Sequence, residues 1–239
     1  SVPSGSLVQR RSLPALVTRL VRRGRVRATF WERFGICSPE VRTRLARRDD
    51  WIWVHAVSVG EMLVARRFIA RLREMHPDAG VVLSTTTSAD LAQARARSDD
   101  AVETIYYPLD FPFAVRAALR RVRPRAVVFV EAAPWPNLAA GAWRAGARLA
   151  IVDARVSPRS RRRYARFRQI VRPLFSTLDL VCVSEADDAA FWTSMGVRAD
   201  RVVRTGSIKH ESSAPDPERV AAIRARLDVR LEGRTCRKA

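Results

Sequence analysis

The sequence predicts a doubly wound α/β fold built around a parallel sheet. From residue 51 onward, short apolar runs rich in β-branched residues alternate with longer amphipathic stretches, which is the pattern of parallel strands joined by crossover helices. The amphipathic stretches repeat their apolar residues at helical spacing, as helices that cover a sheet do. An open sheet of this type binds its ligands at the carboxyl ends of the strands, where the strand order reverses. Functional residues are therefore expected directly after the predicted strands.

Strands and helices can be assigned along most of the chain. The predicted strands are 51–57, 81–85, 103–106, 126–131, 148–152, 179–183 and 201–204. Three predicted helices lie between them, and each has one apolar stripe. The stripes are Ala65, Phe68, Ile69 and Leu72 in the first; Phe111, Val115, Ala118, Leu119 and Val122 in the second; and Tyr164, Phe167, Val171 and Leu174 in the third, near 159–175, which turns its arginines outward.

One Rossmann-like domain is predicted over residues 14–211. It begins with a short basic amphipathic helix at 14–23, which either packs on the domain or lies on an anionic bilayer surface. Residues 1–13 mix Ser, Pro and Gly without periodicity and are expected to form a disordered tail. Residues 212–239 are expected to form a linker helix and a tail with almost nothing to bury, which has the look of a truncated or frame-shifted end.

The formal net charge of +20 comes almost wholly from arginine. A guanidinium stays charged and bonds phosphate with a planar fork, so the expected partner is anionic: nucleic acid, anionic lipid or a sugar phosphate. A GC-rich coding bias is an alternative source of the arginines. Nucleic acid ranks last, because surfaces that bind it interleave aromatic and basic residues, whereas the tryptophans here fall mostly in predicted strands and turns.

The sequence lacks the motifs and residue patterns of several function classes. The three cysteines are far apart and odd in number, so neither a disulfide framework nor a zinc site is expected. Without an apolar run of about 18 residues or a secretory signal, the chain is expected neither to span a membrane nor to be exported. P-loop, dinucleotide-binding, serine-hydrolase and D-x-D nucleotide-sugar motifs are all lacking. Neither a metal nor a cofactor is expected.

The strongest candidate for chemistry is Glu61. Residues 51–61 form an apolar strand that runs into Ser58, Gly60 and Glu61 just where a helix is predicted. Gly60 permits a tight strand-to-helix turn, which places the Glu61 carboxylate at a helix N-terminus that faces the ligand crevice. There it is suited to take a proton from a substrate hydroxyl; the alternative is that it only complements the helix dipole. His55, on the strand itself, is expected to be a core residue.

Further candidates follow the other predicted strands. They are Thr85 and Thr86 after the second strand, Glu131, Trp135 and Asn137 after the fourth, and Arg155 after the fifth. Hydroxyl groups at such a position cap a helix or bind sugar and phosphate oxygens. A tryptophan held between two prolines is either a rigid binding aromatic or a core residue. An arginine at a strand end is suited to meet an anionic group.

Seven short segments occur in the order found in one enzyme family. They are Trp31–Gly35, Trp53–Glu61, Ser84–Thr87, Tyr107–Asp110, Trp135–Asn137, Asp153–Ser157 and Thr205–Lys209. Over about residues 14–211 the chain thereby resembles the 3-deoxy-D-manno-octulosonic acid (Kdo) transferases of lipopolysaccharide assembly. Seven segments in register are far more specific than any one of them.

This resemblance implies a GT-B glycosyltransferase. Its N-terminal Rossmann-like domain would receive a lipid A precursor, and its C-terminal domain would bind the donor CMP-Kdo. The family transfers Kdo with inversion and without a metal, with Glu61 in the position of the base. It usually sits peripherally on the cytoplasmic face of the inner membrane, an anionic surface. On the same motifs, Ser58, Gly60 and Lys209 join the candidate substrate-binding residues.

The sequence departs from the family in two places. The family's second acidic residue before the Trp-Pro-Asn segment is replaced by Ala133, and no second Rossmann-like domain follows within the 239 residues. The expected function is therefore Kdo transfer that needs a separately supplied donor half. The alternative is a catalytically silent module that binds anionic lipid A or a partner enzyme.

Overall fold

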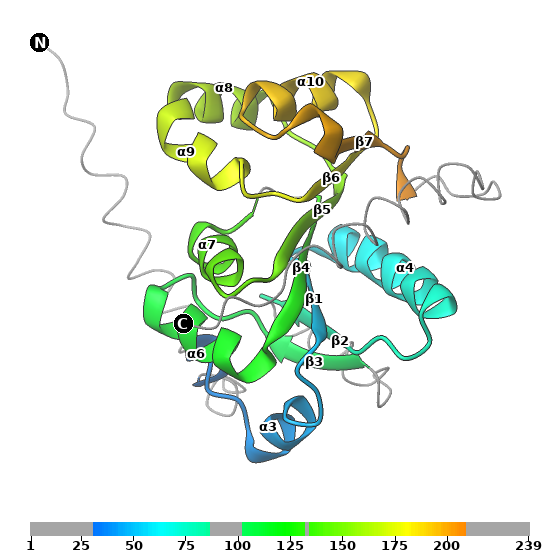
Figure 1. Ribbon diagram of the computed structural model, residues 1–239, viewed down its shortest axis with the longest axis vertical. Coiled ribbons are helices and arrows are strands. Elements are labelled where there is room, and N and C mark those ends of the chain that lie inside the picture. Colours follow the sequence, from blue (N-terminus) through cyan, green and yellow to red (C-terminus); the bar gives the residue numbers. More distant parts are fainter. Residues whose placement is uncertain (1–30, 87–101, 132–133, 209–239) are drawn as a thin grey trace, which may run out of the picture.

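The computed structural model describes residues 31–86, 102–131 and 134–208, which form a seven-stranded sheet with helices on both faces (Figure 1). The strands are β1 (Trp51–His55), β2 (Val81–Thr85), β3 (Val102–Tyr106), β4 (Pro124–Val130), β5 (Arg148–Ala154), β6 (Leu180–Val183) and β7 (Val202–Arg204). Every pair of neighbouring strands is parallel. The predicted doubly wound α/β fold and its seven strands are confirmed.

The strand order reverses between β1 and β4. The sheet reads β3-β2-β1-β4-β5-β6-β7, so the chain moves outward from β1 to β3 and then returns to the other side of β1. The crossover connections therefore diverge at this point, and ligands of open α/β sheets are expected at the carboxyl ends of the strands beside it, here β1 and β4. His55 pairs with Phe129 in register, so the residues that follow these two strands leave the sheet at the same edge.

The two faces of the sheet are covered unequally. Helix α4 (Val59–Met75) packs on one face, against Ile52 and Val54. Alternate residues of the same strand, Trp51 and Trp53, point to the opposite face and join a larger cluster there. The helices that contribute buried residues to the larger cluster are α3 (Pro39–Leu45), α6 (Pro112–Val122), α7 (Pro136–Arg144), α9 (Arg168–Phe175) and α10 (Ala186–Ser194).

Most residues of the predicted apolar stripes are buried in the structure. Ala65 and Ile69 are buried under α4, and the four later members of the second stripe are buried under α6. Phe111 is an exception, since it is the N-cap of α6 and half of its surface is exposed. The prediction that it faces inward is wrong because the helix begins one residue later, so helical spacing does not fix the direction of its ring.

The predicted helix near 159–175 is two helices, α8 (Pro158–Arg166) and α9. They meet at Phe167, whose backbone leaves the helical region at φ −107° and ψ 27°. The break turns α9 relative to α8, so one stripe does not continue through both. Tyr164 and Val171 still pack against the larger cluster, but Phe167 is exposed and lies under the guanidinium of Arg166. The prediction that Phe167 points inward is therefore wrong.

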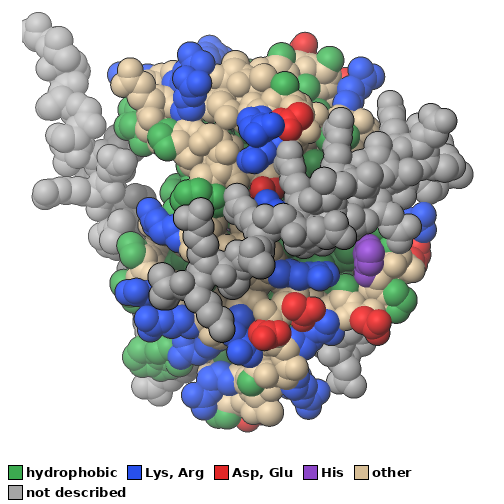
Figure 2. Space-filling model, in the orientation of Figure 1, with side chains coloured by type: hydrophobic (Ala, Val, Ile, Leu, Met, Phe, Trp, Pro, Cys, Tyr) green, Lys and Arg blue, Asp and Glu red, His purple; other side chains and the backbone are tan. Residues whose placement is uncertain are grey.

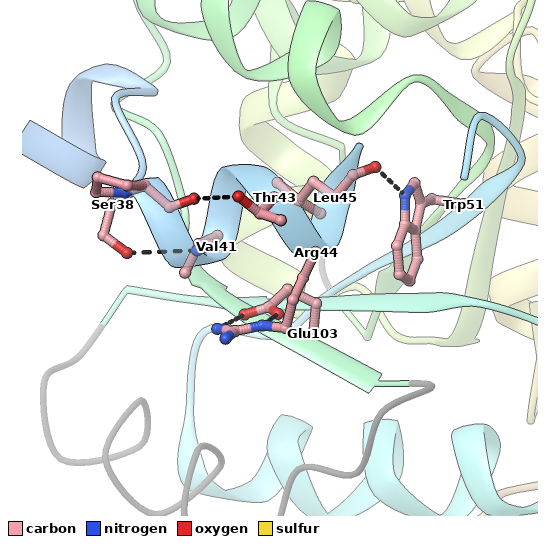
Figure 3. A network of polar contacts seen from close by, with 8 residues as sticks. Ser38, Val41, Thr43, Arg44, Leu45, Trp51 and Glu103 are labelled. Atoms are coloured by element: carbon pink, nitrogen blue, oxygen red, sulfur yellow. Dashed lines mark hydrogen bonds and ion pairs between the residues drawn. The ribbon is translucent and has the colours of Figure 1, made fainter. Parts of the chain in front are cut away.

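Helix α3 is fastened to the edge strand β3 and to β1 (Figure 3). Ser38 caps the helix by accepting a hydrogen bond from the Val41 amide at 3.4 Å. Arg44 bonds both carboxylate oxygens of Glu103, with Nη2 donating to Oε1 at 3.2 Å. The indole Nε1 of Trp51 donates to the Leu45 carbonyl at 3.0 Å. Both attachments to the sheet thus leave from the C-terminal end of α3, while its N-terminal end is capped by Ser38.

We expect Arg44→Met to lower the free energy of unfolding by about 2 kcal/mol, because it leaves the almost fully buried Glu103 carboxylate without its charged partner. Urea denaturation checks this value. The matched control is Arg71→Met, which breaks an ion pair with Glu74 that is exposed on both sides and should cost less than about 0.5 kcal/mol. Equal effects of the two substitutions would contradict the assigned role of Arg44.

Three domain-level expectations lie outside the described residues. They are the disordered tail at 1–13, the basic helix at 14–23, and the linker helix and tail at 212–239. They stay predictions.

Candidate functional site

Glu61 lies in the first turn of α4, directly above the carboxyl end of β1. Ser58 is the N-cap, and its Oγ accepts a hydrogen bond from the Glu61 amide at 3.2 Å. In return, Glu61 Oε2 accepts one from the Val57 amide at 2.6 Å. This reciprocal arrangement resembles a capping box. One carboxylate oxygen therefore stabilises the turn, and Gly60 lies half-buried inside the first turn of α4, between Ser58 and Glu61 in the chain.

The environment of Glu61 makes its carboxylate more basic than usual. Burial raises the pKa of Glu61, and the negative charge of Glu131 raises it further, while hydrogen bonds from Val57 and Ser58 act in the opposite direction. The two acidic groups at the switch point therefore interact electrostatically. A carboxylate with a raised pKa accepts a proton more readily, which is what a general base near neutral pH requires.

Glu131 and Asp153 hold an unusual backbone conformation at the ends of β4 and β5. Their φ angles are 57° and 51°, in the left-handed region that side chains disfavour. Neighbouring strands hold the turn in place, since the Glu131 amide donates to the Val152 carbonyl at 2.9 Å and the Arg155 amide donates to the Glu131 carbonyl at 3.2 Å. Such strain persists where the surrounding structure enforces it, and it clusters at functional sites.

Arg155 connects the end of β5 with the segment that follows β7. Its Nε lies 3.8 Å from Oδ2 of the buried Asp153, whose other oxygen accepts a hydrogen bond from Ser184 Oγ at 2.9 Å. Its Nη2 donates to Ser207 Oγ at 2.7 Å. Ser184 was not predicted as a site residue, although it follows β6 and the rule that pointed to Glu131 would have found it.

The hydroxyl residues after β2 divide into different roles. Ser84 Oγ accepts a hydrogen bond from Trp53 Nε1 at 2.8 Å and lies 3.0 Å from His55 Nδ1, so it belongs to the interior. Thr85 is fully buried, and its Oγ1 has no hydrogen-bond partner within the part of the chain that the structure describes. Thr86 is half-buried and is the better placed of the two predicted threonines to meet a ligand.

Three rings form a wall beside the switch point. The ring centroids of His55 and Tyr107 are 4.0 Å apart, and those of Tyr107 and Trp135 are 5.2 Å apart. Burial lowers the pKa of His55 to about 3, so the imidazole is neutral. Trp135 is about one third exposed, which favours a binding aromatic over a core residue.

Asn137 is engaged with Asp110 rather than turned toward open space. The Asp110 carboxylate accepts hydrogen bonds from the amides of Asn137 and Leu138 at 3.0 and 2.9 Å, which caps α7. The side-chain amide of Asn137 donates back to the Asp110 carbonyl at 2.5 Å. Asp110 was not predicted as a site residue, although it stands in one of the matching segments. Lys209 lies outside the described residues.

At the switch point the described residues thus place a basic carboxylate, a second carboxylate, an arginine and a wall of aromatic rings at one edge of the sheet. This set can accept a proton from a hydroxyl group and hold an anionic group. Among residues 31–86, 102–131 and 134–208, no group of three or more His, Cys, Asp and Glu side chains is placed to hold a metal ion. None of the described helices is long and apolar enough to cross a membrane.

Comparison with known proteins places this chain in a family. The sequence profile described as 3-Deoxy-D-manno-octulosonic-acid transferase (kdotransferase) matches residues 28–212. The 3-deoxy-D-manno-octulosonic acid transferase of Bordetella pertussis is 31% identical over 223 residues, which cover 89% of this chain and 50% of that protein. The Haemophilus influenzae transferase of the same name is 27% identical over 190 residues, which cover 75% of this chain and 44% of that protein.

Among solved structures, the UDP-GlcNAc 2-epimerase from Methanocaldococcus jannaschii matches 77% of this chain and 50% of its own, with a TM-score of 0.49 and 10% identity. The chain spans about half the length of the curated relatives named above. The profile match extends from the 3₁₀ helix η1 (Trp31–Phe34) past β7 and therefore includes every described element. The chain belongs to the 3-deoxy-D-manno-octulosonic acid (Kdo) transferase family.

Proposed function

We propose that this chain is the acceptor-side half of a glycosyltransferase that moves Kdo from CMP-Kdo to a lipid A precursor in lipopolysaccharide assembly. The observation that carries the proposal is the Glu61 carboxylate, which is held at the switch point of the sheet and made more basic by burial. Glu61 takes the proton from the attacking acceptor hydroxyl. The neighbouring second half, in the GT-B arrangement, binds the donor.

The remaining site residues receive proposed roles from their positions. Arg155 holds an anionic group of a substrate at the edge of the crevice, since its side chain is partly exposed and already donates a hydrogen bond there. Trp135 and Thr86 contact the sugar. Glu131, Ser58 and Gly60 shape the surroundings of Glu61, and Asn137 maintains the turn that carries Trp135.

The test is reconstitution. Residues 1–239 are fused to the C-terminal half of the Bordetella pertussis relative, and Kdo transfer from CMP-Kdo to a lipid A precursor is measured. We expect transfer by the fusion and none by the 239-residue chain alone, because the proposal assigns the donor pocket to the half of the relative that this chain does not match. Transfer by the isolated chain would contradict the proposal, as would a folded fusion that binds both substrates without reacting.

The second candidate is a catalytically silent module that binds anionic lipid A or a partner enzyme. Ala133, which stands where the resemblance implies a second acidic residue, favours it. This candidate predicts that the isolated chain binds the lipid A precursor but that the fusion transfers no Kdo. The same reconstitution therefore separates the two.

We further propose a peripheral location on the cytoplasmic face of the inner membrane. Helices α8 and α9 contain no acidic residue. Apart from Arg161, which pairs with Asp188, their arginines add positive charge to the surface. Such a surface is attracted to anionic lipid headgroups, and salt screens the attraction.

A further inference from the structure

Strand β5 contains one extra residue near its carboxyl end. From Ile151 to Ala154 the chain advances by three residues, whereas the paired stretch of β6, residues 181–183, advances by two. Asp153 lies in this bulge with a left-handed φ of 51°, a conformation that aspartate and asparagine adopt more readily than most residues. A bulge re-aims a side chain and is common beside active sites. Here the Asp153 side chain is fully buried.

The two oxygens of the Asp153 carboxylate have different neighbours. Oδ1 accepts a hydrogen bond from Ser184 Oγ at 2.9 Å. Oδ2 has no hydrogen-bond partner within residues 31–86, 102–131 and 134–208, and it lies 3.8 Å from Nε of Arg155. This distance is too long for a hydrogen bond, but opposite charges still attract each other strongly there, because the carboxylate is out of contact with water. Ser184 thus orients the carboxylate, and the carboxylate attracts the guanidinium.

The guanidinium of Arg155 has one edge engaged and one end open. Nε faces Asp153, and Nη2 on the same edge donates to Ser207 Oγ at 2.7 Å. In Arg48 the same edge instead binds both oxygens of a single carboxylate, that of Asp50. Nη1 of Arg155 makes no hydrogen bond to the described part of the chain, and 42% of the side chain is exposed. This end of the guanidinium is therefore available to a ligand.

Arg155 lies beside the acidic groups of the candidate functional site. Its amide donates to the Glu131 carbonyl at 3.2 Å. Burial raises the pKa of Glu61, and Glu131 is close enough for its charge to raise that pKa further. Figure 2 shows basic side chains spread over this face of the molecule, so positive charge alone does not single out a place for an anion. The contacts that fix one edge of the Arg155 guanidinium do.

We propose that Asp153 and Ser184 are positioning residues, which hold Arg155 so that its Nη1 end binds a phosphate or carboxylate group of a substrate. A guanidinium binds such a group through two parallel N–H bonds, here from Nη1 and the second hydrogen of Nη2. Holding the side chain in place beforehand lowers the entropy that is lost on binding. The inference rests on the proposed function only for the identity of the substrate, since both candidate functions include an anionic ligand.

The test measures anion binding by the 239-residue chain with isothermal titration calorimetry. The probes are the deacylated lipid A precursor, the same sugar without its phosphate groups, and free Kdo, which supplies a carboxylate. We expect the chain to bind at least one charged probe more tightly than the neutral sugar, and the preferred probe identifies the source of the anion. Arg155→Met should weaken that binding by roughly 10- to 100-fold, because hydrogen bonds to a charged group are lost.

Asp153→Asn tests the positioning role itself. Asparagine has the same size, tolerates the left-handed backbone and can still accept the hydrogen bond from Ser184, so only the charge is lost. The variant should bind the charged probe roughly three- to tenfold more weakly. In an Arg155→Met background the same substitution should change the affinity by less than about twofold, because the group that it positions is gone. A merely structural residue would weaken binding equally in both backgrounds.

The matched control is Asp200→Asn. Asp200 lies in the 3₁₀ helix η2 (Ala199–Arg201), which precedes β7 at the amino edge of the sheet, and it accepts hydrogen bonds from Nε and Nη2 of Arg198, both at 3.0 Å. Both partners are exposed, so the affinity should change by less than about twofold. Thermal unfolding verifies that each variant is folded. If Asp153→Asn does not fold, Ser184→Ala replaces it, with about a threefold loss expected.

Three results would overturn the proposal. They are full affinity of a folded Asp153→Asn chain, an equal loss in both backgrounds, and a wild-type chain that binds neither charged probe more tightly than the neutral sugar. If the fusion transfers no Kdo while the chain keeps anion binding that depends on Asp153, only the transferase proposal is contradicted. The two hypotheses therefore fail separately.

Discussion

Glu61→Gln in the reconstituted fusion is expected to reduce turnover by about 100- to 10,000-fold while acceptor binding stays nearly unchanged. Proton removal by a positioned side chain typically contributes this much to a rate. The glutamine carbonyl can still accept the hydrogen bond from the Val57 amide, so the turn is retained and the acid–base function alone is lost. Turnover and acceptor affinity, measured separately, check both parts of the expectation.

The control for this substitution is Ser58→Ala, which removes the cap of the same turn but leaves the carboxylate. It should cost about 1 kcal/mol of stability and far less turnover than Glu61→Gln. The wild-type fusion should also lose activity on the acid side at a higher pH than an ordinary glutamate would give, because the base works only when deprotonated and burial raises the pKa of Glu61. Full turnover by the Gln variant would remove Glu61 from its assigned role.

Asp110→Ala is expected to be the most destabilising polar substitution proposed, at about 3 kcal/mol. The carboxylate accepts hydrogen bonds from two amides at the start of α7 and from the Tyr107 hydroxyl at 3.3 Å, and hydrogen bonds to a charged group contribute about 1.5–3 kcal/mol each without being additive. Loss of the cap should also free the turn that carries Trp135. Urea denaturation gives the free energy, and near-ultraviolet circular dichroism reports on the tryptophan.

The control is Asp187→Ala, an exposed acidic residue in the first turn of α10. Its side chain complements only the helix dipole, so the loss should stay below about 1 kcal/mol. A cost for Asp110→Ala as small as that of the control would show that the carboxylate does not hold α7 in place.

The sheet could be predicted from the sequence because buried parallel strands have a local signature. Trp51 and Trp53 lie on one face and Ile52 and Val54 on the other, and each strand of this kind is bounded by turn residues that the sequence shows directly. The ends of helices could be predicted less well from the sequence. Phe167 fits helical spacing perfectly well, but the break between α8 and α9 depends on how the two helices pack, which spacing does not record.

The sequence predicted where the candidate site residues lie in the fold better than it predicted which residues they contact. Ser58, Gly60 and Glu61 are close in sequence, so the local pattern of a strand followed by a helix start was enough to place the carboxylate in the first turn of α4. Its electrostatic contact with Glu131 comes from a strand far along the chain and needed the structure. Asn137 was predicted to face substrate, yet its partner Asp110 lies 27 residues earlier. Pairings of this kind follow from the tertiary fold, and the composition of neither segment shows them.

The left-handed backbone at Glu131 and Asp153 is expected to make the carboxyl ends of β4 and β5, the rim of the candidate site, open locally more easily than the strand centres. The strained backbone conformation of each such residue costs about 1–3 kcal/mol. This cost is large beside the net folding stability of about 5–15 kcal/mol of an ordinary domain. The ends of β4 and β5 can release this energy by opening locally while the strand centres stay paired. Amide exchange at the rim is then governed by small, frequent openings, whereas the core exchanges only when the whole domain unfolds. Any substrate that bonds the rim closes these openings and makes the domain more resistant to heat.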